Sequence, residues 1–177
     1  MNTEGNVIKR NQYMSLLLLL PIAGALIGEC LAILSSYSNS SYAIEPLQQV
    51  MVLSEIAAAL LIVMFIAGFY CTGRPAMYVL DALRIAAVVL LCVCLYLVLS
   101  QRATLMGYVW FSDLESGNIQ SVKALNFGVA SAAVYAVSIL LCAATGVIEV
   151  VASKMARSRE GIQAQIAALQ KQLESLG

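Results

Sequence analysis

Residues 76–99 read AMYVLDALRIAAVVLLCVCLYLVL, an almost unbroken apolar segment. A helix of about 20 mostly apolar residues is long enough to cross the roughly 30 Å of hydrocarbon in a bilayer. Lipid offers no hydrogen-bond partner to an open backbone, so such a segment is expected to cross as a helix. Two further segments of the same kind precede it and one follows it. The four predicted spanning helices are therefore 13–37, 47–71, 76–99 and 122–152.

The composition of the whole chain supports this interpretation. Of the 177 residues, 61% are hydrophobic and only 11% are charged. A soluble domain carries about 25% charged residues, and one of 150 residues buries only about 70% of its surface, so a water-soluble globular enzyme is excluded. Intrinsic disorder needs low hydrophobicity and is excluded too. Ten basic and ten acidic residues cancel, which gives no global attraction to nucleic acid.

The links between the segments predict the topology. The polar link 38–46 and the four-residue link 72–75 are short, and 100–121 is predicted to be the longest loop. Short cytoplasmic loops are enriched in Lys and Arg. We therefore predict a protein of the bacterial cytoplasmic membrane with both termini on the cytoplasmic side. In this orientation the loops on the outer side contain only two basic residues, Arg102 and Lys123. The inner side then holds Lys9, Arg10, Arg74, Lys154, Arg157, Arg159 and Lys171.

The last residues continue the helical pattern past the membrane. We divide the chain into a membrane-spanning domain, 1–152, and a cytoplasmic helical tail, 153–177. Apolar residues spaced alternately four and three apart form a short heptad seam in the tail. The tail is interpreted either as an amphipathic helix on its own bundle or membrane surface, or as an oligomerisation stem or docking helix. The predicted fold is an all-α integral membrane four-helix bundle with a protruding C-terminal amphipathic helix. The seam consists of Ile162, Ile166, Leu169, Leu173 and Leu176.

Ionisable residues inside a bilayer are costly and are therefore candidate functional positions. Glu29 and Glu55 fall in the outer half of the first two helices, and Lys123 and Asn126 at the start of the fourth could reach the same zone. This outer polar cluster is interpreted as a structural feature, as a contact with a partner, or as a cation or proton site.

A second charged set lies toward the inner side. Asp81 and Arg84 are three residues apart and share a helical face, and Glu149 could join them from the fourth helix. We interpret this set mainly as a charge lock that holds the register of the helices.

Two glycines on the first helix are spaced for close helix packing. Gly24 and Gly28 form a G-x-x-x-G face that favours such packing, within the bundle or between chains.

The sequence lacks the motifs that carry reactive chemistry. The chain has no histidine, no C-x-x-C pair and no glycine-rich phosphate loop, so we expect no catalytic residue, no metal ligand and no cofactor.

Residues 107–118, GYVWFSDLESGN, are the most individual stretch of the predicted outer loop. The aromatic side chains are interpreted either as an interfacial belt or as an exposed surface that contacts a partner. The candidate contact residues are Tyr108, Trp110, Phe111, Asp113 and Glu115.

The same stretch, 107–118, resembles one in small uncharacterised four-helix membrane proteins of anaerobic gut bacteria. The resemblance covers this loop and the general four-helix plan. It implies an accessory subunit associated with membrane-linked glycoside hydrolases, and it implies no catalytic residue in this chain.

Two functions follow as hypotheses. The first is a non-enzymatic membrane subunit or scaffold that assembles with itself or with a larger partner, such as a glycoside hydrolase. The alternative is a small ion- or proton-coupled transporter or channel that uses Glu29 and Glu55.

Overall fold

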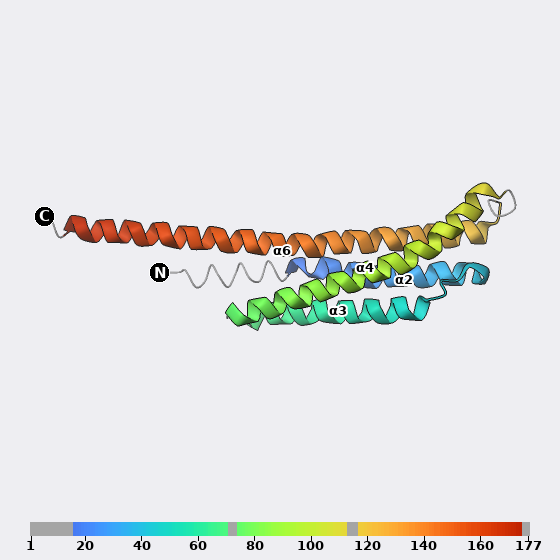
Figure 1. Cartoon of the computed structure of the whole chain (residues 1–177), viewed down its shortest axis with the longest axis horizontal. Helices are drawn as coiled ribbons and strands as arrows, with labels where there is room; N and C mark the ends of the chain where they lie inside the picture. The colour runs from blue at the N-terminus through green and yellow to red at the C-terminus, as the bar shows by residue number, and fades with distance from the viewer. Residues whose placement is uncertain (1–15, 71–73, 113–116, 175–177) are drawn as a thin grey trace.

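The computed structural model describes residues 16–70, 74–112 and 117–174, apart from some side chains inside the helices. Four long helices and one short 3-10 helix make up these residues, and no strand occurs among them (Figure 1). The all-α prediction is therefore confirmed. In chain order the elements are α2 (Leu19–Ser38), η1 (Ser40–Tyr42), α3 (Leu47–Tyr70), α4 (Arg74–Phe111) and α6 (Ile119–Glu174).

The four helices form an antiparallel bundle. Helix α2 packs on α3 and α6, and α4 packs on the same two helices from the other side. The beginning of α2, the α3–α4 hairpin and the free half of α6 share one end of the bundle, which we call the tail end (Figure 1). The 39–46 link, the end of α4 and the start of α6 lie at the other end, which we call the distal end.

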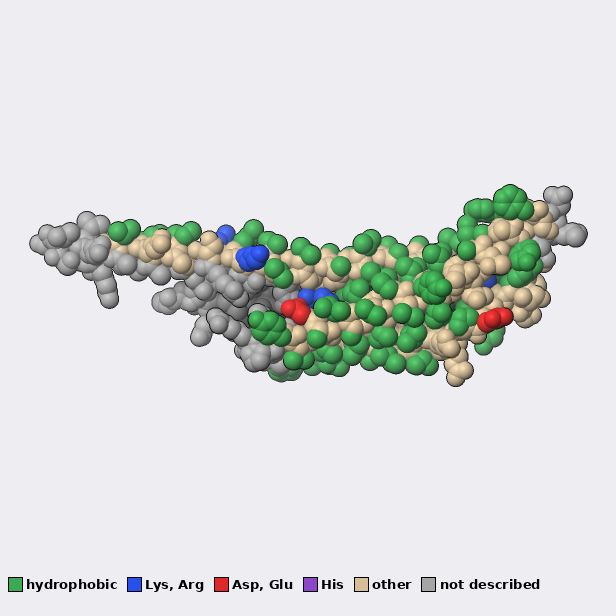
Figure 2. All heavy atoms as spheres, viewed as in Figure 1, with side chains coloured by type: hydrophobic (Ala, Val, Ile, Leu, Met, Phe, Trp, Pro, Cys, Tyr) green, Lys and Arg blue, Asp and Glu red, His purple; other side chains and the backbone are tan. Residues whose placement is uncertain are grey.

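All four helices are long and apolar enough to cross a membrane. At least half of each candidate span is not buried inside the bundle, and its outward side chains are large and apolar. Hydrophobic side chains cover much of the bundle surface in Figure 2. Such a surface is stable only where lipid covers it, which indicates an integral membrane protein. The spans are Leu19–Ser38, Leu47–Gly68, Tyr78–Phe111 and Ile119–Ile148.

The prediction that the third helix ends at residue 99 and that 100–121 is a loop is wrong. Helix α4 runs to Phe111, and α6 begins at Ile119. The reason is that an apolar face continues beyond the predicted end: Val98, Leu105 and Val109 are all buried. Leu105 and Val109 pack with the first turns of α6, so burial holds this part of α4 in a helix.

The prediction that the fourth helix continues past the membrane into the tail is confirmed, since α6 runs without a break to Glu174. At 1.5 Å per residue, the part of α6 beyond Ile148 is about 39 Å long. Figure 1 shows that this half of α6 extends away from the other helices. We call residues 149–174 the stem.

Serine hydroxyls and small residues hold the helices together inside the bundle. Ser131 of α6 donates a hydrogen bond of 2.7 Å to the carbonyl of Gly28 on α2, and Ser54 of α3 donates one of 3.1 Å to Ala25. In lipid, packing and hydrogen bonds replace the hydrophobic effect as the forces between helices. Small residues matter because they let backbones approach closely enough for these bonds.

Candidate functional site

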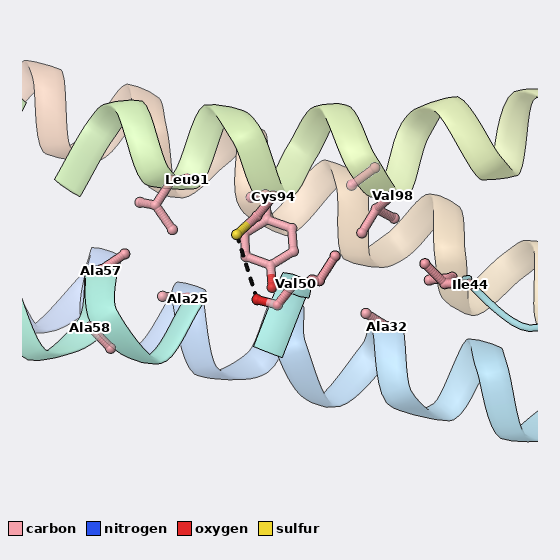
Figure 3. Close-up of a cluster of buried hydrophobic side chains, with 11 residues drawn as sticks. Ala25, Ala32, Ile44, Val50, Ala57, Ala58, Leu91, Cys94 and Val98 are labelled. Carbon is pink, nitrogen blue, oxygen red and sulfur yellow. Dashed lines mark hydrogen bonds between the residues drawn. The ribbon is translucent and has the colours of Figure 1, made fainter. Parts of the chain in front are cut away.

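A buried polar cluster lies in the middle of the bundle, and each helix contributes one residue to it. Glu29 of α2 is 8% exposed, and Ser54 of α3, Cys94 of α4 and Tyr135 of α6 are fully buried. The hydroxyl of Ser54 lies beside both the Glu29 carboxyl and the Tyr135 phenol. Figure 3 shows the thiol of Cys94 donating to the carbonyl of Val50, at 3.7 Å. We call Glu29, Ser54, Cys94 and Tyr135 the central cluster.

The predicted outer polar set is only partly brought together. The carboxyls of Glu29 and Glu55 are close enough to interact electrostatically. Glu55, however, is exposed on the outer surface of α3 rather than buried in the cluster. Lys123 and Asn126 are exposed on α6, and Lys123 is not among the charges that act on Glu29. The polar neighbours of Glu29 in the structure are Ser54 of α3 and Tyr135 of α6. The sequence analysis had singled out neither residue.

The central cluster offers a carboxyl, two hydroxyls and a thiol. The phenol oxygen of Tyr135 is buried and has no hydrogen bond of good geometry in the described part of the chain. A buried polar atom of this kind is costly unless a water molecule or another polar group pairs with it. Among the described residues, no three His, Cys, Asp or Glu side chains converge on one point.

The predicted inner charges lie near the tail end. The Nη1 atom of Arg84 lies 3.3 Å from Oδ1 of Asp81, so the two residues form an ion pair on one face of α4. The guanidinium of Arg84 also packs against Gly146 of α6. Glu149 follows on α6, and its side chain lies outside the described part of the structure.

The small-residue face of α2 packs inside the bundle. A Cβ at Gly24 would overlap the hydroxyl of Ser138 on α6, and one at Gly28 would lie 3.1 Å from the ring of Tyr135. Both glycines therefore serve the contact between α2 and α6 of the same chain. This resolves the alternative of packing between chains, which the sequence left open.

The aromatic residues of the predicted outer loop lie on the last turn of α4. Tyr108, Trp110 and Phe111 are all exposed, and the ring of Tyr108 lies 6.5 Å from that of Tyr42 in the 39–46 link. These positions fit either an interfacial belt or a contact surface. Asp113 and Glu115 lie outside the described residues.

The seam of the stem is exposed to its surroundings. Ile162, Ile166 and Leu169 are 54%, 50% and 60% exposed, and they lie on a part of α6 that extends beyond the bundle. These three residues therefore do not pack on the bundle of their own chain. The side chains of Leu173 and Leu176 lie outside the described residues.

Sequence reasoning missed Arg102, which it placed in an exposed loop. The side chain is 1% exposed, and its Nη1 donates a hydrogen bond of 2.8 Å to the carbonyl of Tyr42. The spacing of Val98, Leu105 and Val109 could have revealed it, because Arg102 falls on the same helical face.

Comparison of the chain with protein-family models, with curated proteins and with solved structures finds no match.

Proposed function

We propose that this chain is a non-enzymatic membrane subunit that anchors a helical stem in the bilayer and assembles with further copies of itself through that stem. The observation that carries the proposal is the apolar seam on a helix that no other described element of the chain covers. Exposed apolar surface on a helix beyond the bundle is a typical mark of a partner surface.

A second copy of the chain fits this seam better than an unrelated partner. The four positions that flank the seam between Ile162 and Leu173 are glutamine, which is neutral, so two identical helices meet without like-charge repulsion at these positions. Copies inserted in one bilayer hold their stems parallel and at the same height, which raises their effective concentration. These flanking residues are Gln163, Gln165, Gln170 and Gln172.

A charged residue just before the seam weakens the coiled coil. Arg159 falls at a core position of the same heptad register, and a charge there lowers the stability of a coiled coil. Two heptads alone are also shorter than the three or four that usually sustain a coiled coil. Assembly therefore depends on the membrane anchor as well as on the stem, and the isolated stem peptide is expected to remain monomeric.

The tail end is the cytoplasmic side in this proposal. Arg74, Lys154 and Arg159 all belong to this end of the bundle or to the stem, and Lys and Arg are enriched on the cytoplasmic side of short loops. A reporter fused after Gly177 that is active only in the cytoplasm tests this orientation, and its inactivity would contradict it.

The experiment that tests assembly compares Leu169→Asp with Ala164→Asp. The first substitution places a charge in the seam, and the second places it where the heptad spacing predicts the opposite face. After chemical cross-linking in membranes, we expect the wild type and Ala164→Asp to give the same oligomeric mass, and Leu169→Asp to give the mass of a monomer. An unchanged mass in Leu169→Asp would contradict the proposal.

Purification from the native host separates this proposal from assembly with another protein. A homo-oligomer supports it. A stoichiometric second protein, such as the glycoside hydrolase implied by the resemblance of residues 107–118, would assign the stem or the aromatic surface at Trp110 to that partner instead.

A second candidate function rests on the central cluster. Glu29 is buried beside hydroxyls of two neighbouring helices, and buried carboxyls of this kind carry protons or cations in transporters. The test is flux into proteoliposomes under a pH or cation gradient, with Glu29→Gln compared with Glu55→Gln as the exposed control. Transport predicts that flux is lost in Glu29→Gln, and wild-type flux no greater than that of empty liposomes would exclude it.

A further inference from the structure

The guanidinium of Arg102, at the distal end, is a buried charged group with only part of its hydrogen-bonding capacity used. Its aliphatic stem lies against Gly128 of α6, where an added Cβ would approach Cγ, Cδ and Nε to 2.6 Å. Its Nη1 donates to the carbonyl of Tyr42 in the 39–46 link. The other two nitrogens, Nε and Nη2, are buried and have no hydrogen-bond partner among the described residues.

Among the described residues, no acidic side chain compensates the charge of Arg102. Arginine cannot lose its proton in a protein, so the guanidinium stays charged wherever it lies. A buried charge is tolerated when it is paired and its donors are bonded, and an unpaired one is strongly destabilising. Of the described acidic residues, none forms an ion pair with Arg102. Glu45, the acidic residue of the link to which Arg102 is bonded, is exposed.

The two unbonded nitrogens define the chemistry of the missing partner. Nε and Nη2 lie on one edge of the planar guanidinium, and their N–H groups point the same way. This edge matches the two oxygens of a carboxylate or phosphate, which accept parallel hydrogen bonds from it. A single carbonyl or a water molecule could accept from these donors, but it carries no negative charge and would not compensate the guanidinium.

The depth of the site favours phosphate. The link that contributes Tyr42 begins where the span of α2 ends, at Ser38, and closes where the span of α3 begins, at Leu47. The guanidinium that reaches this link therefore lies at the level where two spans leave the hydrocarbon. Phosphate groups of phospholipids lie at that level, just outside the apolar layer.

We propose that the Nε–Nη2 edge of Arg102 binds a phosphate group at the distal end of the bundle. The source is either the headgroup of an anionic phospholipid or free phosphate. Because Arg102 is 1% exposed, binding requires the 39–46 link or a neighbouring side chain to shift. Gly128 supports the site, since its lack of a side chain leaves the room in which the arginine stem lies.

The experiment measures thermal unfolding of the full-length chain in a mild detergent, in three arms. One arm adds inorganic phosphate, one adds phosphatidylglycerol, and one adds zwitterionic phosphatidylcholine. The variants are Arg102→Met, which removes the charge, and Arg102→Lys, which keeps the charge but lacks the two-nitrogen edge. Lys123→Met is the matched control, because Lys123 is an exposed cation on the first turns of α6.

We expect the wild type and Lys123→Met to gain thermal stability from phosphatidylglycerol or from phosphate, and Arg102→Met to gain nothing. Without either addition, Arg102→Met should unfold at the same or a higher temperature than the wild type, because apolar residues replace buried charges without loss. Arg102→Lys should bind at least about tenfold more weakly, which corresponds to about 1.4 kcal/mol.

The arms also distinguish the source of the phosphate. A gain from phosphatidylglycerol alone identifies a lipid headgroup, and a gain from inorganic phosphate identifies the free anion. Equal behaviour of the wild type and Arg102→Lys in every arm would overturn the proposal. So would a loss of stability in Arg102→Met that is the same with and without phosphate, because that result assigns Arg102 only the bond to Tyr42. If Arg102→Met fails to fold, the comparison with Arg102→Lys decides.

Discussion

Two arginines of α4, Arg84 and Arg102, pack against α6 in the same way but differ in how their charge is paired. They are eighteen residues apart, which is five helical turns, so they lie on the same face of the helix. Each lies against a glycine of α6, and the glycines, Gly146 and Gly128, are also eighteen residues apart. Antiparallel helices thus repeat one contact at the two ends of the bundle.

The two contacts differ in how the charge is compensated. Arg84 has Asp81 three residues before it, and the two side chains pair at 3.3 Å. The position three residues before Arg102 is Leu99, which offers no charge. Arg102 is also more deeply buried, with 1% exposure against 12% for the side chain of Arg84. A glycine opposite an arginine thus provides space for the stem, while the charge needs a partner from another source.

The largest expected effect comes from filling the space beside the more buried arginine. Gly128→Ala places a methyl group 2.6 Å from three atoms of a side chain that has no room to move. Overpacking costs about 1–3 kcal/mol, and with three stem atoms this close we expect the upper end of that range. After the gain in helix propensity of about 1 kcal/mol, the net destabilisation in chemical unfolding in detergent micelles should be about 2 kcal/mol.

Gly146→Ala is the matched comparison, because its nearest neighbour, at 2.9 Å, is the flexible end of Arg84. The gain in helix propensity of about 1 kcal/mol offsets this contact, so the net change should be near zero. Gly107→Ala, with open space around it, is the control for propensity alone. Equal effects at Gly128 and Gly146 would contradict the distinction between the two sites.

A smaller effect is expected from a double-mutant cycle. Arg102→Ala removes the atoms that a methyl group at Gly128 would meet, so the double variant should recover part of the loss. We expect a coupling of about 1 kcal/mol between these two substitutions, and less between Gly146→Ala and Arg84→Ala. Additive free energies of unfolding at the distal pair would show that Gly128 acts through another neighbour.

The smallest effect is expected at the ion pair. Asp81→Asn removes the charge that pairs with Arg84, but the side chain of Asp81 is 56% exposed. Pairs at this spacing on an exposed helix face contribute about 0.2–0.5 kcal/mol. The free energy of unfolding should therefore fall by about 0.3 kcal/mol and the difference should shrink at high salt. A loss above about 1 kcal/mol would show that Asp81 has a further role.

The four helices could be predicted from the sequence because the signal for a membrane span is local. Apolar length within one segment, such as 76–99, is sufficient, since lipid covers the helix wherever protein does not. The end of α4 could not be predicted in this way. Gln101 and Arg102 interrupt the apolar run, and only the contact of Leu105 and Val109 with α6 keeps the chain helical to Phe111.

The candidate sites show the same division. The pairing of Asp81 with Arg84 follows from their spacing on one helix, and Glu29 follows from being a carboxyl inside an apolar run. Ser54 and Tyr135 come from two other helices, and their closeness to Glu29 depends on how those helices are rotated. A single sequence contains no signal for that rotation, because its spans are apolar all round.

The fold class, the number of spans and the apolar spacing of the stem follow from the amino-acid sequence, because each depends on composition and spacing within one helix. The exposure of the seam, the burial of polar side chains and the contacts they make depend on how the helices pack. Arg102 shows the reason. Read along α4 it is a charge near the end of a span, and it becomes a buried and partly unbonded group only when Gly128 of α6 and Tyr42 of the link close around it.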